Sequence, residues 1–345
     1  MTNLAVRNET SPPRRAGRGA ARRRAIVRMV GRRLLFFVPV LAVVSAAVFA
    51  AAAASPFDPL VGYLGTRYVT TSETDKALIA EELGFDRPWY SAYGDWLSAV
   101  SSGDLGMSRT FDQPVAQVVS ERLPWTLLLT AVGLTAAIVL SLAIGTWSGM
   151  HRGGRIDRIV SAICVVVQSL PPFVLALGTV AVLAVATGWF PVAGLTDAGA
   201  DPTVGQVLRH LALPAGVLAL SQMPWLLLAV RESVSSARGE DFVAGAVARG
   251  IPPSLVTRRH ILPTSLAPFV TIIGVRLPEI LVGAVLVEEV FSWPGLASAV
   301  VESARNLDMS LLAVLTVGTV LLVMAGSLLA DVVYAGLDPR VSTDG

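Results

Sequence analysis

The sequence predicts an all-α integral membrane protein with six transmembrane helices and both termini in the cytoplasm. Hydrophobic residues make up 53% of the 345 residues and charged residues only 15%, well below the roughly 25% charged residues of soluble proteins. The apolar residues gather in six long runs, and the arginines concentrate between alternate runs. Together these observations exclude an ordinary soluble domain.

Each predicted span is long enough to cross a bilayer. A hydrocarbon core of about 30 Å needs ~20 mainly apolar residues as α-helix. Six segments meet this requirement: 34–54, 123–149, 159–187, 211–230, 266–287 and 310–335. Pro171 and Pro172 remove two successive amide donors from the third segment, so we expect a break there, with 156–169 as a separate first half. Gly145 and Gly149 would permit close helix approach.

Basic residues set the predicted orientation. With the N-terminus inside, nineteen lysines and arginines lie in cytoplasmic segments and seven in external segments. We therefore expect a basic, partly disordered cytoplasmic tail over 1–33, then a first span and an extracytoplasmic loop over 34–122. A five-helix core over 123–340 follows, with a cytoplasmic loop over 231–263, and the chain ends in a tail over 341–345.

The N-terminal region has an alternative interpretation. An arginine-rich flank, an apolar run and Ala52–Ala53–Ala54 also resemble a cleavable signal peptide. Because the run of about 20 residues exceeds the usual apolar core of a signal peptide, we favour a retained anchor.

Several kinds of site are not indicated. Lys76, the single lysine, does not follow a glycine, so the chain has no phosphate-binding P-loop. Cys164 is the only cysteine, and the histidines are widely spaced, which favours polar loop positions over a metal site: His151, His210 and His260. No Gly-x-Ser-x-Gly or His-Glu-x-x-His motif occurs, and an intramembrane hydrolase is only an alternative. We expect no catalytic residue, metal ligand, bound cofactor or nucleic-acid partner.

The cytoplasmic loop contains the pattern of a short amphipathic helix. Glu240 and Asp241 favour a helix N-terminus through their charge. Gly250 is a candidate C-cap, before Pro252–Pro253. An apolar stripe recurs at helical spacing: Phe242, Val243, Ala246, Val247 and Ile251. Its apolar side would face either lipid or a groove on a partner protein.

A second short helix could follow in the same loop, from Ser254 to His260, ending before Pro263.

Polar residues inside a span are functional candidates by default. Arg276 and Glu279 are three residues apart on one helix face, with Pro278 suggesting a kink between them. They either line a substrate path or form a structural ion pair facing a partner. Asp331, near the end of the last span, is interpreted as a partner or interface contact.

Glu288, Glu289 and Trp293 follow the fifth span. Trp293 fits an interfacial aromatic, and whether either glutamate contacts cargo stays open.

The loop spacing is similar to the EAA loop of ABC-importer permeases, in which Glu-Ala-Ala, three residues, Gly, nine or ten residues and Leu-Pro follow one another. The corresponding residues here are Ala244–Gly245–Ala246, Gly250 and Leu262–Pro263. Ala244 stands at the Glu position, a departure also expected in the peptide branch, and EDFVAGAVARG is similar to that version.

The resemblance extends over nearly the whole chain, to the dipeptide/oligopeptide/nickel permease family. The segments that carry it, in order, are LGFDRPWYSAYGDWLS, GDLGMSR, QPVAQVVSERLPWTLLL, QSLPPFVLALG, RHILPTSLAPFVT, VEEVFSWPGL and LDPRV.

The resemblance implies a type I ABC-importer permease fold in the bacterial plasma membrane. It implies a second homologous permease, two ATPase subunits that carry ATP and Mg, and an extracytoplasmic substrate-binding protein as partners. It also implies an outer gate near Glu288 to Trp293 and a short helix over 297–306. The cargo would be a peptide, or alternatively nickel or another small solute. An ion-coupled secondary transporter and a non-transporting scaffold are the alternatives of other classes.

The loop residues implied to couple the permease to an ATPase are Glu240, Asp241, Val243, Ala244, Gly245, Ala246, Val247, Gly250, Leu262 and Pro263. The candidate path or gate residues are Arg276, Glu279, Glu288, Glu289 and Trp293.

Overall fold

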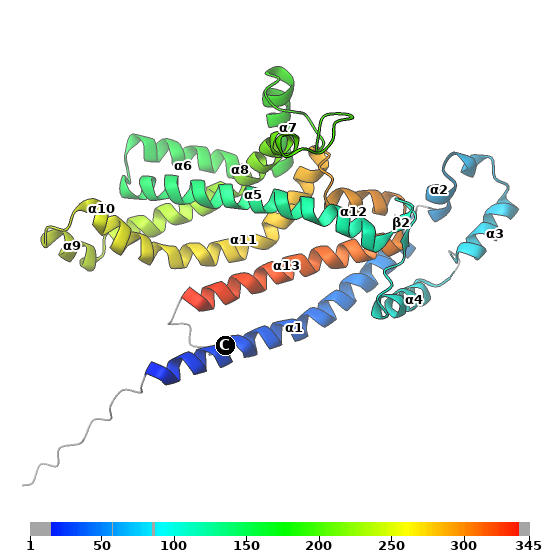
Figure 1. The fold of residues 1–345 in the computed structure, drawn as a ribbon, viewed down its shortest axis with the longest axis horizontal. Coiled ribbons are helices and arrows are strands. Elements are labelled where there is room, and N and C mark those ends of the chain that lie inside the picture. Colours follow the sequence, from blue (N-terminus) through cyan, green and yellow to red (C-terminus); the bar gives the residue numbers. More distant parts are fainter. Residues whose placement is uncertain (1–14, 57, 85–86, 338–345) are drawn as a thin grey trace, which may run out of the picture.

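The computed structural model describes residues 15–56, 58–84 and 87–337. Over these ranges the chain folds into long helices that lie side by side in an elongated bundle, with one short antiparallel hairpin (Figure 1). The hairpin pairs β1 (Met107–Ser108) with β2 (Gln113–Pro114). This confirms the all-α prediction at the level of fold class.

The helices before the centre of the bundle are α1 (Arg15–Ala53), α2 (Pro59–Leu64), the 3-10 helix η1 (Gly65–Val69), α3 (Glu73–Leu83) and α4 (Trp89–Ser101). Next come α5 (Val115–Met150), α6 (Arg155–Gln168), α7 (Pro172–Thr179), the π-helix η2 (Val180–Ala186) and α8 (Val204–Arg238). The last are α9 (Asp241–Ala248), α10 (Pro253–Val256), the π-helix η3 (Thr257–Ile261), α11 (Leu262–Val290), α12 (Leu296–Arg305) and α13 (Met309–Leu337).

α5 and α8 form the centre of the bundle. α11 packs on α8, α13 on α11, and α1 on α13, so α1 lies at one side (Figure 1). Glycines allow α5 to approach α8 closely: a Cβ at Gly145 would lie 2.8 Å from the Leu227 carbonyl oxygen, and one at Gly149 would lie 2.7 Å from that of Arg231. The predicted role of Gly145 and Gly149 is therefore confirmed.

Among the described residues, four helices are long and apolar enough to cross a membrane: Ile26–Ala53, Val115–Met150, Val204–Arg238 and Met309–Val332. Arg155–Gln168 and Pro172–Ala186 make a fifth if they count as one span, and they are bent by 104° at the break. The break falls at Pro171 and Pro172, as predicted, because neither proline has an amide hydrogen to continue the helix.

Two predicted boundaries were wrong. α1 is already helical at Arg15, where we expected a tail, and residues 1–14 lie outside the described ranges. α8 begins at Val204 rather than at 211, because Thr203 caps its N-terminus by accepting a hydrogen bond from the Gln206 amide. His210, expected in a loop, is consequently a buried residue of α8.

The separate helix predicted from Ser254 to His260 was also wrong. Helix begins at Pro253 and continues through Pro263 into α11 without interruption. The π-turn explains this result, since the Leu262 amide donates to the Thr257 carbonyl, five residues back. α10 and α11 are therefore joined as one continuous helix.

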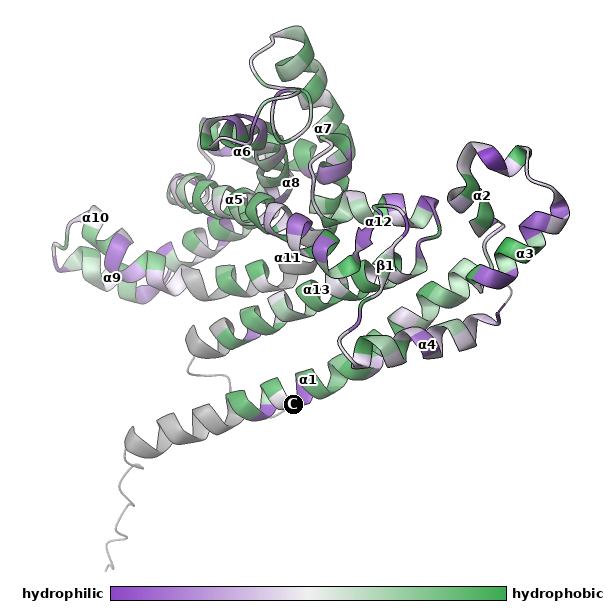
Figure 2. Cartoon of the chain, turned by 45° about the vertical axis from the view of Figure 1, so that its right-hand side comes forward, coloured by the Kyte–Doolittle hydropathy of each residue, from purple (hydrophilic) through white to green (hydrophobic). Residues whose placement is uncertain are grey.

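Hydrophobic side chains cover the outside of the bundle as well as its interior (Figure 2). Leu35 and Phe36 on α1 and Val185 on η2 are exposed. In water such surfaces would be unusual, whereas lipid-facing helices need no polar cover.

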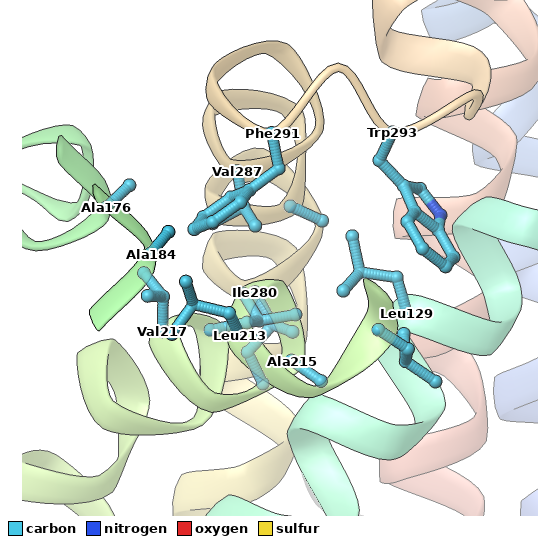
Figure 3. Packing of buried hydrophobic residues seen from close by; sticks show 13 residues of the cluster. Leu129, Ala176, Ala184, Leu213, Ala215, Val217, Ile280, Val287, Phe291 and Trp293 are labelled. Carbon is cyan, nitrogen blue, oxygen red and sulfur yellow. The ribbon is translucent and has the colours of Figure 1, made fainter. Parts of the chain in front are cut away.

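One interior cluster joins α5, α7, η2, α8 and α11. It contains Leu129, Ile280, Phe291 and Trp293, all fully or almost fully buried (Figure 3). This packed cluster fixes the positions of α8 and α11, which carry the polar residues described below.

Candidate coupling surface and translocation path

α9 lies at one end of the bundle and presents an apolar surface. Glu240 is its N-cap residue, with an extended backbone, and Asp241 is in its first turn. Val243 and Ala246 are buried against the end of α8, while Phe242 is 43% exposed and Val247 58% exposed. The predicted stripe is thus divided: Val243 and Ala246 attach α9 to the rest of the chain, Ile251 is partly buried against the same cluster, and the other two residues are left at the surface.

Gly250 ends α9 in a left-handed conformation, with φ +72°. The Gly250 amide donates to the Val247 carbonyl at 2.9 Å, and the Ile251 amide donates to the Ala246 carbonyl at 3.2 Å. This is the Schellman arrangement, in which glycine is preferred because it has no Cβ. A Cβ at Gly250 would meet nothing within 4 Å, so the requirement for glycine is conformational.

The other predicted loop residues lie on α9 and at the start of α11. Ala244 and Gly245 are exposed on α9. Leu262 and Pro263 lie in the first turn of α11, Leu262 half-buried and Pro263 exposed. All of these residues lie within the 231–263 segment, which the sequence predicts to be cytoplasmic.

A buried ion pair beside this segment was missed by the sequence analysis. Asp157 of α6 accepts hydrogen bonds from the Arg231 guanidinium (2.8 Å from Nη2 to Oδ2), from the Gly153 amide (2.8 Å) and from the Ser148 hydroxyl. It therefore ties α5, α6 and α8 together just before α9. Asp157 and Arg231 are far apart in sequence, and only their positions at the ends of apolar runs could have suggested the pair.

Arg276 and Glu279 form the ion pair that their spacing predicted. The Arg276 guanidinium also stacks on Trp225 of α8, 3.9 Å from the ring centroid. Arg276 is largely covered, whereas the Glu279 side chain is 57% exposed. Trp225, which the sequence analysis did not single out, thus belongs to this group.

Glu288 performs a different task. Its carboxylate is fully buried and accepts a hydrogen bond from the Ala297 amide at the start of α12 (2.9 Å to Oε2). A Cβ at Gly295 would overlap this carboxyl group. The Leu296 amide donates to the Thr126 hydroxyl of α5 at 2.8 Å. Glu288 therefore fastens α12 to α11, and we call this contact the α11–α12 clamp.

Glu289 is exposed on the same helix, 3.8 Å from Arg305. Trp293, expected at a membrane–water interface, is instead buried within the protein. Its indole N–H is satisfied there, because it donates to the Trp125 carbonyl at 3.0 Å. Asp331 forms an ion pair with Arg33 of α1, which is a contact within the chain rather than with a partner.

The loop between η2 and α8 is attached to the same end of α11. The Gly194 amide donates to the Phe291 carbonyl at 2.8 Å. Buried His210 contacts the Gly194 carbonyl at 3.1 Å and Asp197 at 3.3 Å. A hydrogen bond from Gln206, with help from His210 and Arg209, lowers the pKa of Asp197 below its usual value.

Residues 137–343 match the family of binding-protein-dependent transport system inner membrane components. The match includes the C-terminal part of α5 and every later helix. The chain belongs to this family. In this permease the 231–263 segment and the polar group of α8 and α11 lie inside the matched region, whereas α1 and the α2–α4 segment precede it.

Named permeases are similar over most of their length. The oligopeptide transport system permease protein AppB of Bacillus subtilis is 32% identical over 289 residues, which cover 84% of this permease and 90% of the relative. OppB of Mycobacterium tuberculosis is 33% identical, with 76% and 83% covered. The glutathione transport system permease protein GsiC of Pectobacterium atrosepticum is 31% identical, with 80% and 88% covered.

A solved structure of the MetNI methionine ABC transporter, in an inward-facing conformation, has the same fold. It superimposes with a TM-score of 0.53 at 18% identity, covering 65% of this permease and 97% of that chain. At this identity the similarity supports the fold of the permease and nothing finer.

Proposed function

We propose that this permease is the membrane subunit of an ATP-driven peptide importer of the bacterial plasma membrane, with six spans and both termini in the cytoplasm. The names of the oligopeptide permeases that it resembles support peptide as cargo. α11, with 29 residues, supplies the span that would complete the six together with the broken third span. The orientation rests on the distribution of its basic residues.

In this proposal the chain works with a second permease, two ATPase subunits that bind ATP and Mg, and an external binding protein. The observation that carries the proposal is the exposed pair Phe242 and Val247 on a helix with a fixed end at Gly250. A short helix with apolar residues on its outer side fits a groove on another protein. Closure of the ATPases would then move α9 together with the helices to which it is attached.

Val247 and Val204 provide a matched test of this coupling surface. Both valines are exposed, one on α9 and the other at the opposite end of α8. Val247→Asp introduces a charge into the proposed interface, so we expect it to abolish co-purification of the ATPase subunits and ATP-driven uptake of radiolabelled trialanine into proteoliposomes. Val204→Asp should leave ATPase co-purification intact.

If the Val247→Asp complex kept its ATPase subunits and its uptake activity, α9 would not be the coupling element. A wild-type complex that takes up none of a panel of di-, tri- and tetrapeptides, although its ATPases hydrolyse ATP, would refute peptide as the cargo.

A further inference from the structure

A cavity of about 420 Å³ lies where the third span is broken. α6 ends there at Gln168, and Pro172 begins α7. α8 contributes Ser221, Gln222 and Trp225, and α11 contributes Glu279 and its neighbours Val282, Gly283 and Leu286. We call it the break cavity. Its size is in the range of small-ligand sites.

Two of the residues that line the break cavity have buried amide oxygens that lack a hydrogen-bond donor. Within the part of the chain that the structure describes, neither Gln168 Oε1 nor Gln222 Oε1 has a partner. Gln222 is nearly fully buried, and its Nε2 donates to the Ser221 hydroxyl at 3.3 Å, which leaves the oxygen free. Unsatisfied buried acceptors are costly and require an explanation, such as a ligand that donates to them.

The wall of the cavity carries a carboxylate whose charge is paired with Arg276. Among the described lining residues Glu279 alone is ionisable, and more than half of its side chain is exposed. Arg276 does not line the cavity, because it is held between Glu279 and the Trp225 ring. The cavity therefore offers a carboxylate and two carbonyl-type oxygens, all of them hydrogen-bond acceptors.

The depth of the cavity makes this composition significant. Gln222 lies near the middle of α8 and Glu279 near the middle of α11. Ionisable groups at such depth face a water-filled path or a polar partner rather than lipid. An ammonium group, with several donors and a positive charge, complements the three acceptors.

We propose that the break cavity is a cargo-contact site for the protonated amino group of a peptide, which Glu279, Gln168 and Gln222 bind through their oxygens. The inference rests on the proposed function and specifies which end of the cargo the permease contacts. It differs from a structural role for the Arg276–Glu279 pair, in which the carboxylate would contact only a neighbouring permease.

The test measures peptide binding by the assembled permease–ATPase complex in lipid nanodiscs. Equilibrium dialysis with radiolabelled trialanine gives the affinity, and N-acetyl-trialanine, which lacks the ammonium, is the competitor. We expect the acetylated peptide to compete at least tenfold more weakly, and Glu279→Gln to weaken trialanine binding at least tenfold, as for loss of a charged hydrogen bond. Glu121→Gln, which changes an exposed glutamate of α5 outside the cavity, is the matched control and should bind as wild type.

Gln222→Leu keeps the ion pair and removes one acceptor, so it serves as the second variant if Glu279→Gln does not assemble. It should weaken trialanine binding severalfold. Equal affinity for the two peptides, unchanged binding by both variants, or no binding by wild type would each overturn the inference. ATP-driven uptake tests the proposed function separately. A complex that imports trialanine but shows no selectivity for the amino group would support the proposed function and overturn the inference about the break cavity.

Discussion

At the scale of single residues, the carboxylates of this permease differ in how their oxygens are used. Asp157 and Glu288 are buried and accept hydrogen bonds from neighbouring helices, so they hold helices together. Glu279 also lies within an apolar run of the sequence, but its side chain is more than half exposed and lines the break cavity. The sequence places all three near apolar runs, and only the packing separates structural carboxylates from one that can meet a ligand.

Asp157→Ala should lower the free energy of unfolding by about 3–5 kcal/mol, because it leaves the Arg231 charge without its buried partner. Chemical denaturation of the detergent-solubilised permease measures this cost. The double variant Asp157→Leu with Arg231→Met should recover most of the loss, since neither charge remains. An Asp157→Ala cost that is the same in the Arg231→Met background would show that the ion pair is not its origin.

At the scale of helices, the contact between α5 and α8 depends on small residues. Gly149 lies against the backbone of α8, where a Cβ would be 2.7 Å from the Arg231 carbonyl oxygen and 2.9 Å from Val234 Cβ. Backbone cannot move aside as a flexible side chain can. The sequence pattern could indicate this approach, but not which helix would be met.

Gly149→Ala should therefore destabilise the permease by about 1–3 kcal/mol through overpacking. Gly178→Ala in α7 is the matched control, because nothing lies within 4 Å of its Cβ position; it should be neutral or slightly stabilising, since alanine favours helix. Melting temperatures of the two variants in detergent provide the comparison. A Gly149→Ala protein as stable as Gly178→Ala would contradict the close contact.

The loop before α8 should respond to acid. The pKa of Asp197 is lowered in the folded protein, chiefly by its hydrogen bond from Gln206. A lowered pKa means that the carboxylate stabilises the fold above its unfolded pKa of about 3.9, and that this stabilisation is lost as pH falls through the folded value.

Asp197→Asn should thus lower the melting temperature slightly at pH 7, and the difference from wild type should shrink as pH falls below about 3.9. Asp201→Asn, an exposed change in the same loop, should have no effect at either pH 7 or pH 3. A melting-temperature difference between wild type and Asp197→Asn that is as large at pH 3 as at pH 7 would be inconsistent with this role.

Much of the helical arrangement could be predicted, and the exceptions have physical causes. Pro171 and Pro172 break the third span, and Gly250 ends α9, because those residues act through their own backbone. The burial of Trp293 depends on a carbonyl at Trp125, far away in sequence. The helix continues through Pro263 because of a π-turn, which no local sequence pattern predicts. Of the candidate site, the ion pair Arg276–Glu279 was predictable from spacing, but its stacking on Trp225 was not.

At the scale of the whole molecule, α9 and the α2–α4 segment lie at opposite ends of the long axis (Figure 1). Since the long helices between them run along that axis, the two ends should lie on opposite sides of the membrane. In the orientation that we propose from the distribution of basic residues, α9 would lie in the cytoplasm.

Cysteine labelling can check this topology. Cys164 is buried, and a Cys164→Ser background leaves no native thiol. In that background Ala244→Cys, exposed on α9, should react with an impermeant maleimide only in inside-out vesicles. Ser102→Cys, exposed after α4, should react only in right-side-out vesicles. The reverse labelling would invert the orientation that we propose.

The α11–α12 clamp makes two parts of the chain mechanically dependent on each other. Because the Glu288 carboxylate accepts a hydrogen bond from the first turn of α12, that short helix cannot shift without breaking a buried hydrogen bond to the end of α11. The opposite end of α11 is continuous with α10, which follows α9 after the turn at Gly250. A displacement of α12 therefore acts directly on the continuous helix from Pro253 to Val290, and in the importer that we propose this helix would join the face that meets the binding protein to the segment beside α9.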